Sequence, residues 1–217
     1  MNIIRVNKLG DFEGFPDLTR ISARLDKLYP RFSINTVNWD DYKNKPEVRF
    51  IMAYSNTEIF IKYYVKEKSV KAEKSRDNEM VCEDSCVEFF VAPSQDGLYY
   101  NFEFNSIGTC YLGRGHGRED SGPMDKRIVE KVRRLSSLGH LPFGERKGEI
   151  EWELTIAIPV KLIFKDNTDS IKGRKVKANF YKCGDKLSEP HYLTWNKVMT
   201  EKPDYHRPEY FGEVIFD

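Results

Sequence analysis

Alternation of apolar and polar residues recurs along this chain and marks its strands. Residues 59–66 place apolar side chains at every odd position, and residues 151–158 place them at the even positions until Pro159 ends the run. A period of two predicts a strand with one buried face. Runs of the same kind, separated by turn residues, predict further strands at 48–54, 87–91, 99–105, 176–181 and 212–216.

One segment carries a helical pattern instead. Within residues 124–135, Ile128, Val132 and Leu135 follow helical spacing, with Lys and Arg on the other face. Residues 66–79 are polar and mixed in charge, which predicts a solvated loop. Many short strands with one short helical insertion predict an all-β fold, an antiparallel β-sandwich. No repeat or linker is visible, so residues 1–217 are predicted to form a single domain.

The charge balance excludes some partners. The 217 residues include 35 basic and 34 acidic ones, a formal net charge of +1. Nucleic acids and anionic membrane surfaces call for a concentrated positive field, so neither is a predicted partner. No apolar run is long enough to span a membrane. Residues 1–10 lack the apolar core of a signal peptide, so none is predicted and localisation stays open.

The four cysteines do not form the framework of a disulfide-rich domain in a chain of this length. Cys82 and Cys86 have three residues between them. On one extended strand they would stand about 13 Å apart, too far to share a zinc ion. All four are therefore interpreted as small buried side chains: Cys82, Cys86, Cys110 and Cys183.

A polar face is predicted on two neighbouring strands. Alternation puts Asn101, Glu103 and Asn105 on one face of their strand, opposite three aromatic residues, and puts Glu88 on a face of the strand before it. Carboxylates and amides are the usual partners of sugar hydroxyls, so a polar ligand surface is one interpretation. An exposed sheet face with ordinary polar residues is the other.

Two further segments carry candidate chemistry. Residues 191–211 mix aromatic side chains with two His and one Arg, which is typical of a sugar site but also of a loop packed by its own aromatics. Residues 113–117 (GRGHG) lack the Lys-Ser/Thr ending of a phosphate-binding loop and are interpreted as a flexible turn. Arg114, His116 and Arg118 could border a binding site there.

Spaced blocks of the sequence resemble the family 9 carbohydrate-binding modules, above all the family 9-like proteins of polysaccharide-degrading gut bacteria. The resemblance covers about residues 39–217. It implies a β-sandwich that binds a mono- or oligosaccharide, often at a chain end, without catalysis, during polysaccharide breakdown. The blocks are EDSCVEFFV, NFEFN, IAIP, NFYKCGD and PDYHRPEYFG, in that order.

In characterised modules of that family, two tryptophans clamp a sugar and polar side chains bind its hydroxyls. By resemblance, one clamp position falls near Tyr205, while the other falls near Cys82, which is not aromatic. Trp39, Tyr111 or Trp195 could supply the missing ring. The candidate carbohydrate-binding residues are Glu88, Glu103, Asn105, Tyr111, Arg114, Trp195, Tyr205, His206 and Arg207.

The resemblance also bears on cofactors and partners. It makes bound calcium possible, although no acidic ligand loop is visible in the sequence. It implies a carbohydrate ligand, a glycoside hydrolase acting alongside, and an extracytoplasmic location if a leader has been removed. Two alternatives stay open. Glu88 and Glu103 could be the paired carboxylates of a glycoside hydrolase, or the chain could be a protein-interaction domain whose sugar site has decayed.

Overall fold

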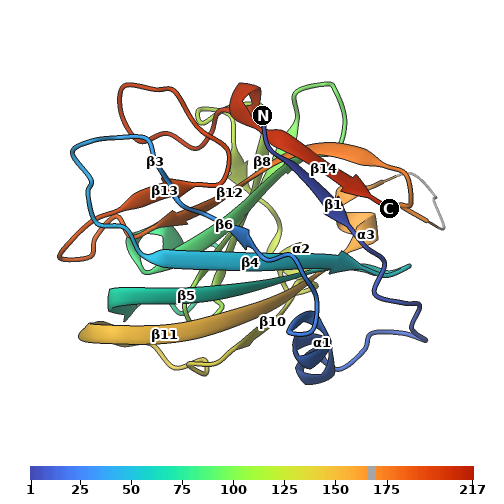
Figure 1. The fold of residues 1–217 in the computed structure, drawn as a ribbon, viewed down its shortest axis with the longest axis horizontal. Coiled ribbons are helices and arrows are strands. Elements are labelled where there is room, and N and C mark those ends of the chain that lie inside the picture. The colour runs from blue at the N-terminus through green and yellow to red at the C-terminus, as the bar shows by residue number, and fades with distance from the viewer. Residues whose placement is uncertain (166–169) are drawn as a thin grey trace.

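The computed structural model describes residues 1–165 and 170–217, which form two β-sheets that face each other (Figure 1). The larger sheet has nine strands. Along its main path they are β1 (Ile3–Val6), β14 (Gly212–Phe216), β12 (Lys175–Cys183), β6 (Cys86–Ala92), β7 (Tyr99–Asn105), β8 (Cys110–Gly115) and β9 (Gly122–Pro123), while β13 (Tyr192–Thr194) pairs with β12 and β3 (Thr36–Val37) pairs with β13.

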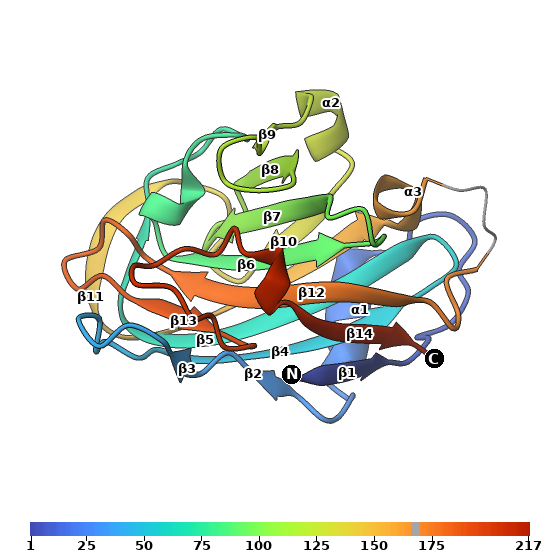
Figure 2. The same cartoon turned by 90° about the horizontal axis from the view of Figure 1, so that it is seen from above.

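The smaller sheet has five strands and lies beneath the larger one, as the view from above shows (Figure 2). Among the strands of the described residues, every pairing is antiparallel except that of β1 with β14, which is parallel. The predicted all-β sandwich is therefore confirmed. The five strands are β10 (Arg133–Ser136), β11 (Phe143–Pro159), β5 (Glu58–Ala72), β4 (Glu47–Tyr54) and β2 (Phe32–Ser33), in that order.

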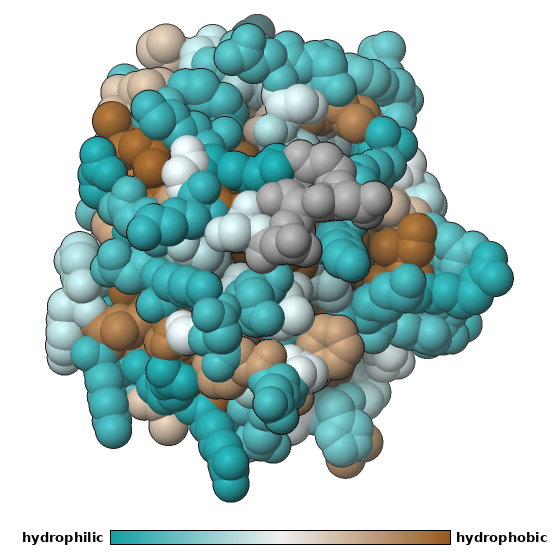
Figure 3. Space-filling view, turned by 90° about the vertical axis from the view of Figure 1, so that its right-hand side faces the viewer, coloured by the Kyte–Doolittle hydropathy of each residue, from teal (hydrophilic) through white to brown (hydrophobic). Residues whose placement is uncertain are grey.

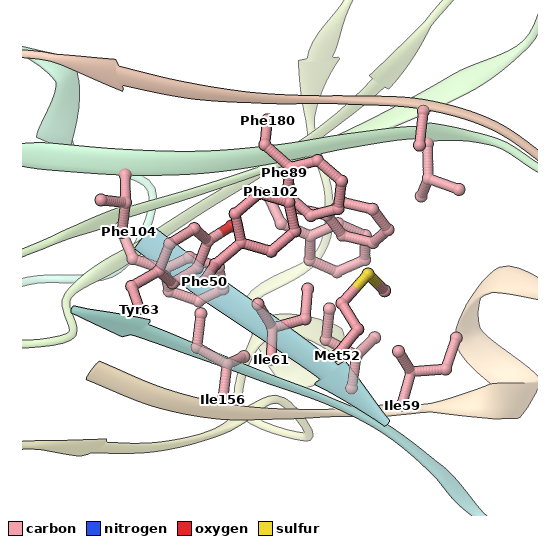
Figure 4. Packing of buried hydrophobic residues seen from close by; sticks show 14 of the residues in the cluster. Phe50, Met52, Ile59, Ile61, Tyr63, Phe89, Phe102, Phe104, Ile156 and Phe180 are labelled. Atoms are coloured by element: carbon pink, nitrogen blue, oxygen red, sulfur yellow. The ribbon is translucent and has the colours of Figure 1, made fainter. Parts of the chain in front are cut away.

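The main core fills the space between the sheets. Phe50 of the smaller sheet stacks on Phe180 of the larger one with ring centroids 4.0 Å apart, and Phe180 lies 5.0 Å from Phe89. Figure 4 shows the Phe89 and Phe180 rings facing Ile61 and Ile156, which project from strands of the smaller sheet. Burial of this interlocking apolar surface is the main force that holds the two sheets together.

A buried cluster of polar side chains lies between the two sheets and joins them. Lys182 on β12 places its Nζ 2.9 Å from Oε2 of Glu67 on β5 and 2.8 Å from Nε2 of His191. Trp152 Nε1 donates to the other oxygen of Glu67 at 2.7 Å. Burial and the nearby Lys182 charge lower the pKa of His191 well below its usual value, so the imidazole is neutral and accepts from Lys182.

Each sheet is also covered on its outer face. Helix α1 (Leu18–Leu25) begins at Asp17, whose side chain accepts from the Arg20 backbone N–H, and it buries Ile21 and Leu25 against the smaller sheet. The outer face of the larger sheet carries a second apolar cluster, centred on Phe90 and Tyr181 and covered by aromatic residues of the segments 39–42 and 192–211. This covering layer encloses the candidate site.

The predicted helix at 124–135 is wrong beyond one turn. Helix α2 spans Lys126–Val129, and the segment then becomes strand β10. Arg133 explains the change, because its guanidinium reaches the fully buried Glu58 carboxylate at 2.6 Å, an interaction that holds β10 beside the neighbouring strands. The sequence showed helical spacing but could not show this distant partner.

Other differences are smaller. The loop predicted at 66–79 is in part strand, because β5 pairs with β11 as far as Ala72. Helix α1 was not predicted, since its apolar face consists of few residues. The remaining helical elements of the described residues are α3 (Val160–Ile163) and two 3₁₀ turns, η1 (Val81–Glu83) and η2 (Pro208–Tyr210).

The surface is largely polar. Hydrophilic residues dominate the face shown in Figure 3, and hydrophobic residues form small separate patches on it. Among the described residues, no helix combines the length and the apolar character needed to cross a membrane.

Candidate functional site

A cavity of about 480 Å³ opens on the outer face of the larger sheet. Strands β6, β7 and β8 supply its floor, and η1, the end of β12 and the C-terminal segment supply its walls. Tyrosine rings and carboxyl groups dominate its lining. The lining residues are Tyr42, Met80, Cys82, Glu88, Asn101, Glu103, Tyr111, Arg118, Ser121, Cys183, Asp185, Tyr192, Pro203, Tyr205 and His206.

Glu88 and Glu103 lie side by side on the floor. They are direct partners in the antiparallel register of β6 and β7, and they are 2% and 7% exposed. Their neighbours on the opposite strand faces, such as Phe89 and Phe102, belong to the main core. The predicted division of these two strands into a polar and an apolar face is therefore confirmed.

Burial sets the protonation of the carboxyl groups. Burial, reinforced by the neighbouring Glu103, raises the pKa of Glu88 well above its usual value, and burial raises the pKa of Glu103 to about 7. Burial likewise raises the pKa of Asp185 to about 6. Near neutral pH, Glu88 is protonated and can donate a hydrogen bond, whereas Asp185 is mainly an acceptor.

Two thiols lie beside the Glu88 carboxyl group. Cys183 Sγ is 3.1 Å from Glu88 Oε1, and Cys86 Sγ is 4.0 Å from the same oxygen. Cys82 lies in η1 and lines the cavity, so the expectation that Cys82 and Cys86 share one strand is wrong. All four cysteines are free.

The His, Cys, Asp and Glu side chains of the described residues form no cluster suited to calcium. Within residues 1–165 and 170–217, the one group of three or more His, Cys, Asp or Glu ligand atoms lying within 4.8 Å of one another is Cys86, Glu88 and Cys183. Two thiols suit a soft metal, whereas calcium takes six or more oxygen ligands. The calcium implied by resemblance therefore does not fit these residues.

Aromatic rings form the walls, and they differ in how deeply they are buried. Tyr205 is 6% exposed, stacks on Tyr181 at 4.0 Å and donates its hydroxyl to the Lys182 carbonyl at 3.1 Å. These contacts hold the Tyr205 ring in the cavity wall and leave little of its face for a ligand to stack on. Tyr42 and Tyr192 meet edge to face at 4.6 Å and are only partly buried. Their rings therefore keep surface that a ligand can cover.

Two basic side chains adjoin the cavity. Arg118 donates to Asp204 from both Nε and Nη2, at 3.1 and 2.9 Å. His206 Nδ1 lies 2.6 Å from the Tyr99 hydroxyl, and burial together with the Arg118 charge lowers the pKa of His206 to about 4. At neutral pH His206 is therefore uncharged, and Arg118 is already paired.

Gly113 is part of strand β8 rather than of the flexible turn predicted at 113–117. It lies opposite Asn101 in the register of β7 and β8, and a side chain at this position would collide with the Asn101 amide. That amide donates to Glu103 Oε1 at 2.9 Å and accepts from the Ser121 hydroxyl at 3.1 Å. Gly113 thus leaves room for the group that orients Glu103.

Five of the nine candidate residues line the cavity: Glu88, Glu103, Tyr111, Tyr205 and His206. The other four lie elsewhere. Asn105 donates its amide to Asp84 Oδ2 and the Lys74 carbonyl, and Arg114 lies over the Tyr100 ring, on the face of β8 opposite Tyr111.

The last two candidates make their contacts outside the cavity. Trp195 packs on Phe180 in the main core, with ring centroids 5.6 Å apart. Arg207 pairs with Asp204 at 2.6 Å beside the cavity. Tyr42 and Asp185 line the cavity but were not among the candidates. Asp185 ends the NFYKCGD block directly after β12, a position that could have indicated it.

Comparison with known proteins settles the family. The model of the family described as "Carbohydrate-binding family 9" matches residues 22–216. The chain belongs to this family. Because family 9 modules bind carbohydrates without cleaving them, it is a non-catalytic carbohydrate-binding module, and the glycoside hydrolase alternative has no support.

Solved structures agree with this assignment. A candidate carbohydrate-binding protein from Bacteroides uniformis is 40% identical, with 99% of each chain covered and a TM-score of 0.92. Two family 9 module structures from Caldicellulosiruptor kristjanssonii, in complex with glucose and with cellotriose, are 12% and 13% identical with TM-scores of 0.57 and 0.53. They cover 100% and 99% of this chain and 96% and 93% of their own, and at this identity they support the fold alone. No curated protein matches the chain.

Proposed function

We propose that the cavity on the outer face of the larger sheet is the sugar-binding site of this family 9 module. The observation that carries the proposal is that partly exposed tyrosine rings and buried carboxyl and amide groups surround one cavity of about 480 Å³. Tyrosine rings stack on the C–H faces of a sugar, while carboxyl and amide groups bind hydroxyls in fixed directions. The volume also lies within the range of about 300–1,000 Å³ common for small-ligand sites.

Each part of the lining has a distinct role in this proposal. Tyr111, Tyr42 and Tyr192 contact the faces and edges of the sugar ring. Glu88 donates to a sugar oxygen, while Glu103 and Asp185 accept from hydroxyls. Tyr205 and His206 shape the wall. Asn105, Arg114, Trp195 and Arg207 are left out of the proposed site because other contacts engage them.

A mono- or oligosaccharide is the proposed ligand, with glucose and cellotriose, the ligands in the C. kristjanssonii complexes, as first compounds to test. We further propose that residues 1–217 act as one domain, because Ile4 and Phe216 share the main core with both sheets. A glycoside hydrolase acting alongside the module is part of the same proposal, since a binding module raises the local concentration of substrate around an enzyme.

The protein-interaction alternative is less well supported. A decayed sugar site would be expected to leave a flat, filled surface, whereas an open cavity lies between Glu88, Glu103 and Tyr205. A non-aromatic residue at Cys82 does not remove the aromatic wall, because Tyr111 also lines the cavity. No observation favours a second function strongly enough to propose one.

Calorimetric titration of the wild-type protein with glucose, cellotriose and end-reduced cellotriose tests the proposal. We expect binding, and we expect Tyr111→Ala to weaken it at least about threefold because one stacking ring is lost. Loss of binding on reduction of the sugar would indicate recognition of the chain end. Tyr205→Ala is less suitable, because this buried ring also supports the fold.

Tyr29→Ala is the matched control, because Tyr29 is 76% exposed and does not line the cavity. Its affinity should equal that of the wild type. A folded wild-type protein that binds no sugar in a broad panel would contradict the proposal. Equal affinities for Tyr111→Ala and the wild type would place the site elsewhere.

A further inference from the structure

Three metal-ligating side chains meet at the floor of the cavity. Cys86 on β6 and Cys183 on β12 are direct partners in the antiparallel register, and Glu88 lies two residues after Cys86 on the same strand. Glu88 Oε1 is 3.1 Å from Cys183 Sγ and 4.0 Å from Cys86 Sγ, and the three atoms lie within 4.8 Å of one another. Residues two apart on a strand share a face, so the sheet itself brings these groups together.

The separations suit a tetrahedral metal ion. In a zinc site the ion is about 2.3 Å from sulfur and about 2.0–2.2 Å from a carboxylate oxygen, which puts its ligand atoms roughly 3.5–3.8 Å apart. The distances observed among the three atoms bracket this range, so side-chain shifts of about 1 Å or less complete the geometry. Strands β6 and β12 are neighbours inside the larger sheet, which holds ligands more precisely than a loop does.

The surroundings of the Glu88 carboxyl group point the same way. Its Oε1 atom contacts two thiols, which donate weakly, and the residue is 2% exposed. A buried carboxyl oxygen normally takes stronger donors, because water no longer solvates it. Thiolate sulfur and carboxylate oxygen are both ligands that zinc binds in proteins, so one ion would satisfy all three groups.

We propose that Cys86, Cys183 and Glu88 form a zinc site at the floor of the cavity. Glu88 and Cys183 line the cavity, so the ion can enter from it and water can take the fourth position. Zinc displaces the protons of its thiol and carboxyl ligands, so these groups need not be ionised before the ion arrives. The inference goes beyond sugar binding, since the ion can bind when no sugar is present.

The test is zinc titration of the whole protein, with its thiols kept reduced, in competition with a chromophoric zinc chelator. We expect a Kd at or below about 1 μM, because structural zinc sites bind at least this tightly. Co²⁺ serves as a spectroscopic stand-in and should give the ultraviolet charge-transfer band of a metal–thiolate bond. Calcium should not displace it, because calcium takes six or more oxygen ligands.

Variants connect the metal to the three side chains. Cys183→Ala should weaken zinc binding at least about 100-fold and lower the charge-transfer band, since even the loss of an outer-shell partner costs about 10–100-fold. Glu88→Gln keeps both thiols and provides a second test if the first variant does not fold. Cys110→Ala is the matched control, because Cys110 is also a free, buried cysteine but belongs to the main core and does not line the cavity. Its zinc affinity should equal that of the wild type.

Two results would overturn the zinc inference. One is equal zinc affinity for Cys183→Ala and the wild type, and the other is a folded, reduced wild-type protein that binds no zinc. Glucose and cellotriose titrations of the zinc-free protein separate this inference from the proposed sugar site. Sugar binding without zinc binding removes the metal site alone, whereas zinc binding without sugar binding removes the sugar site and supports the metal site.

Discussion

Glu88 and Glu103 hold protons more readily in the folded protein than in the unfolded chain, and this affects stability as well as binding. Burial is the main cause for both residues. Where the folded state binds more protons than the unfolded state, the free energy of unfolding falls as pH rises. The stability contribution of each group is therefore complete below its unfolded pKa and declines up to its folded pKa.

For Glu103 this window runs from its usual value of 4.5 to about 7. We expect Glu103 to lower the melting temperature progressively across that range, so that Glu103→Gln, whose amide does not ionise, shows a smaller fall or a larger rise than the wild type. Calorimetric scans at several pH values measure the slope. Glu151→Gln is the control, and a Glu103→Gln slope as steep as that of the wild type would contradict the assigned protonation.

At the scale of secondary-structure elements, the sequence patterns predicted the strands well. They did not predict which segments of the chain contact one another. Strands β7 and β14 have the predicted bounds, because their alternation matches a sheet buried on the inner face. Alternation also identified the polar face of Glu88 and Glu103. It could not show which loops cover that face, so Tyr42 was missed, and it could not show that Asn105 is used by the turn after β7.

Strand β10 carries two long-range ion pairs, Arg133 with Glu58 and Arg134 with Asp77, and the first involves the more deeply buried carboxylate. Arg133→Ala would leave the Glu58 carboxylate, which is fully buried, without its cation, and we expect a loss of about 3 kcal/mol in the free energy of unfolding. Urea unfolding measures the change. Arg127→Ala is the matched control, since its pair with Asp125 is exposed and should contribute nothing measurable. Equal stabilities for the two variants would show that Glu58 does not need its partner.

At the scale of the whole molecule, the buried Lys182–Glu67 ion pair is one of the polar connections between the sheets. Lys182→Met should destabilise the protein by about 3–5 kcal/mol, because it leaves a buried carboxylate with the Trp152 donor but no cation. The double variant Lys182→Met/Glu67→Gln should recover part of the loss, since glutamine is neutral and can still accept from Trp152. Urea unfolding of both variants measures the two free energies of unfolding. A double variant that is less stable than Lys182→Met alone would contradict the expected recovery.

The parallel pairing of β1 with β14 has a consequence for the order of events during synthesis. Residues 3–6 form the first strand of the larger sheet to be synthesised, yet their partners are residues 213–216, which belong to the last of its described strands. Strand β14 lies between β1 and β12, so β1 has no place in the sheet until the final strand has left the ribosome. Strand β1 must therefore wait for β14, and the emergence of β14 rather than that of residues 3–6 sets the earliest moment at which the larger sheet can be completed.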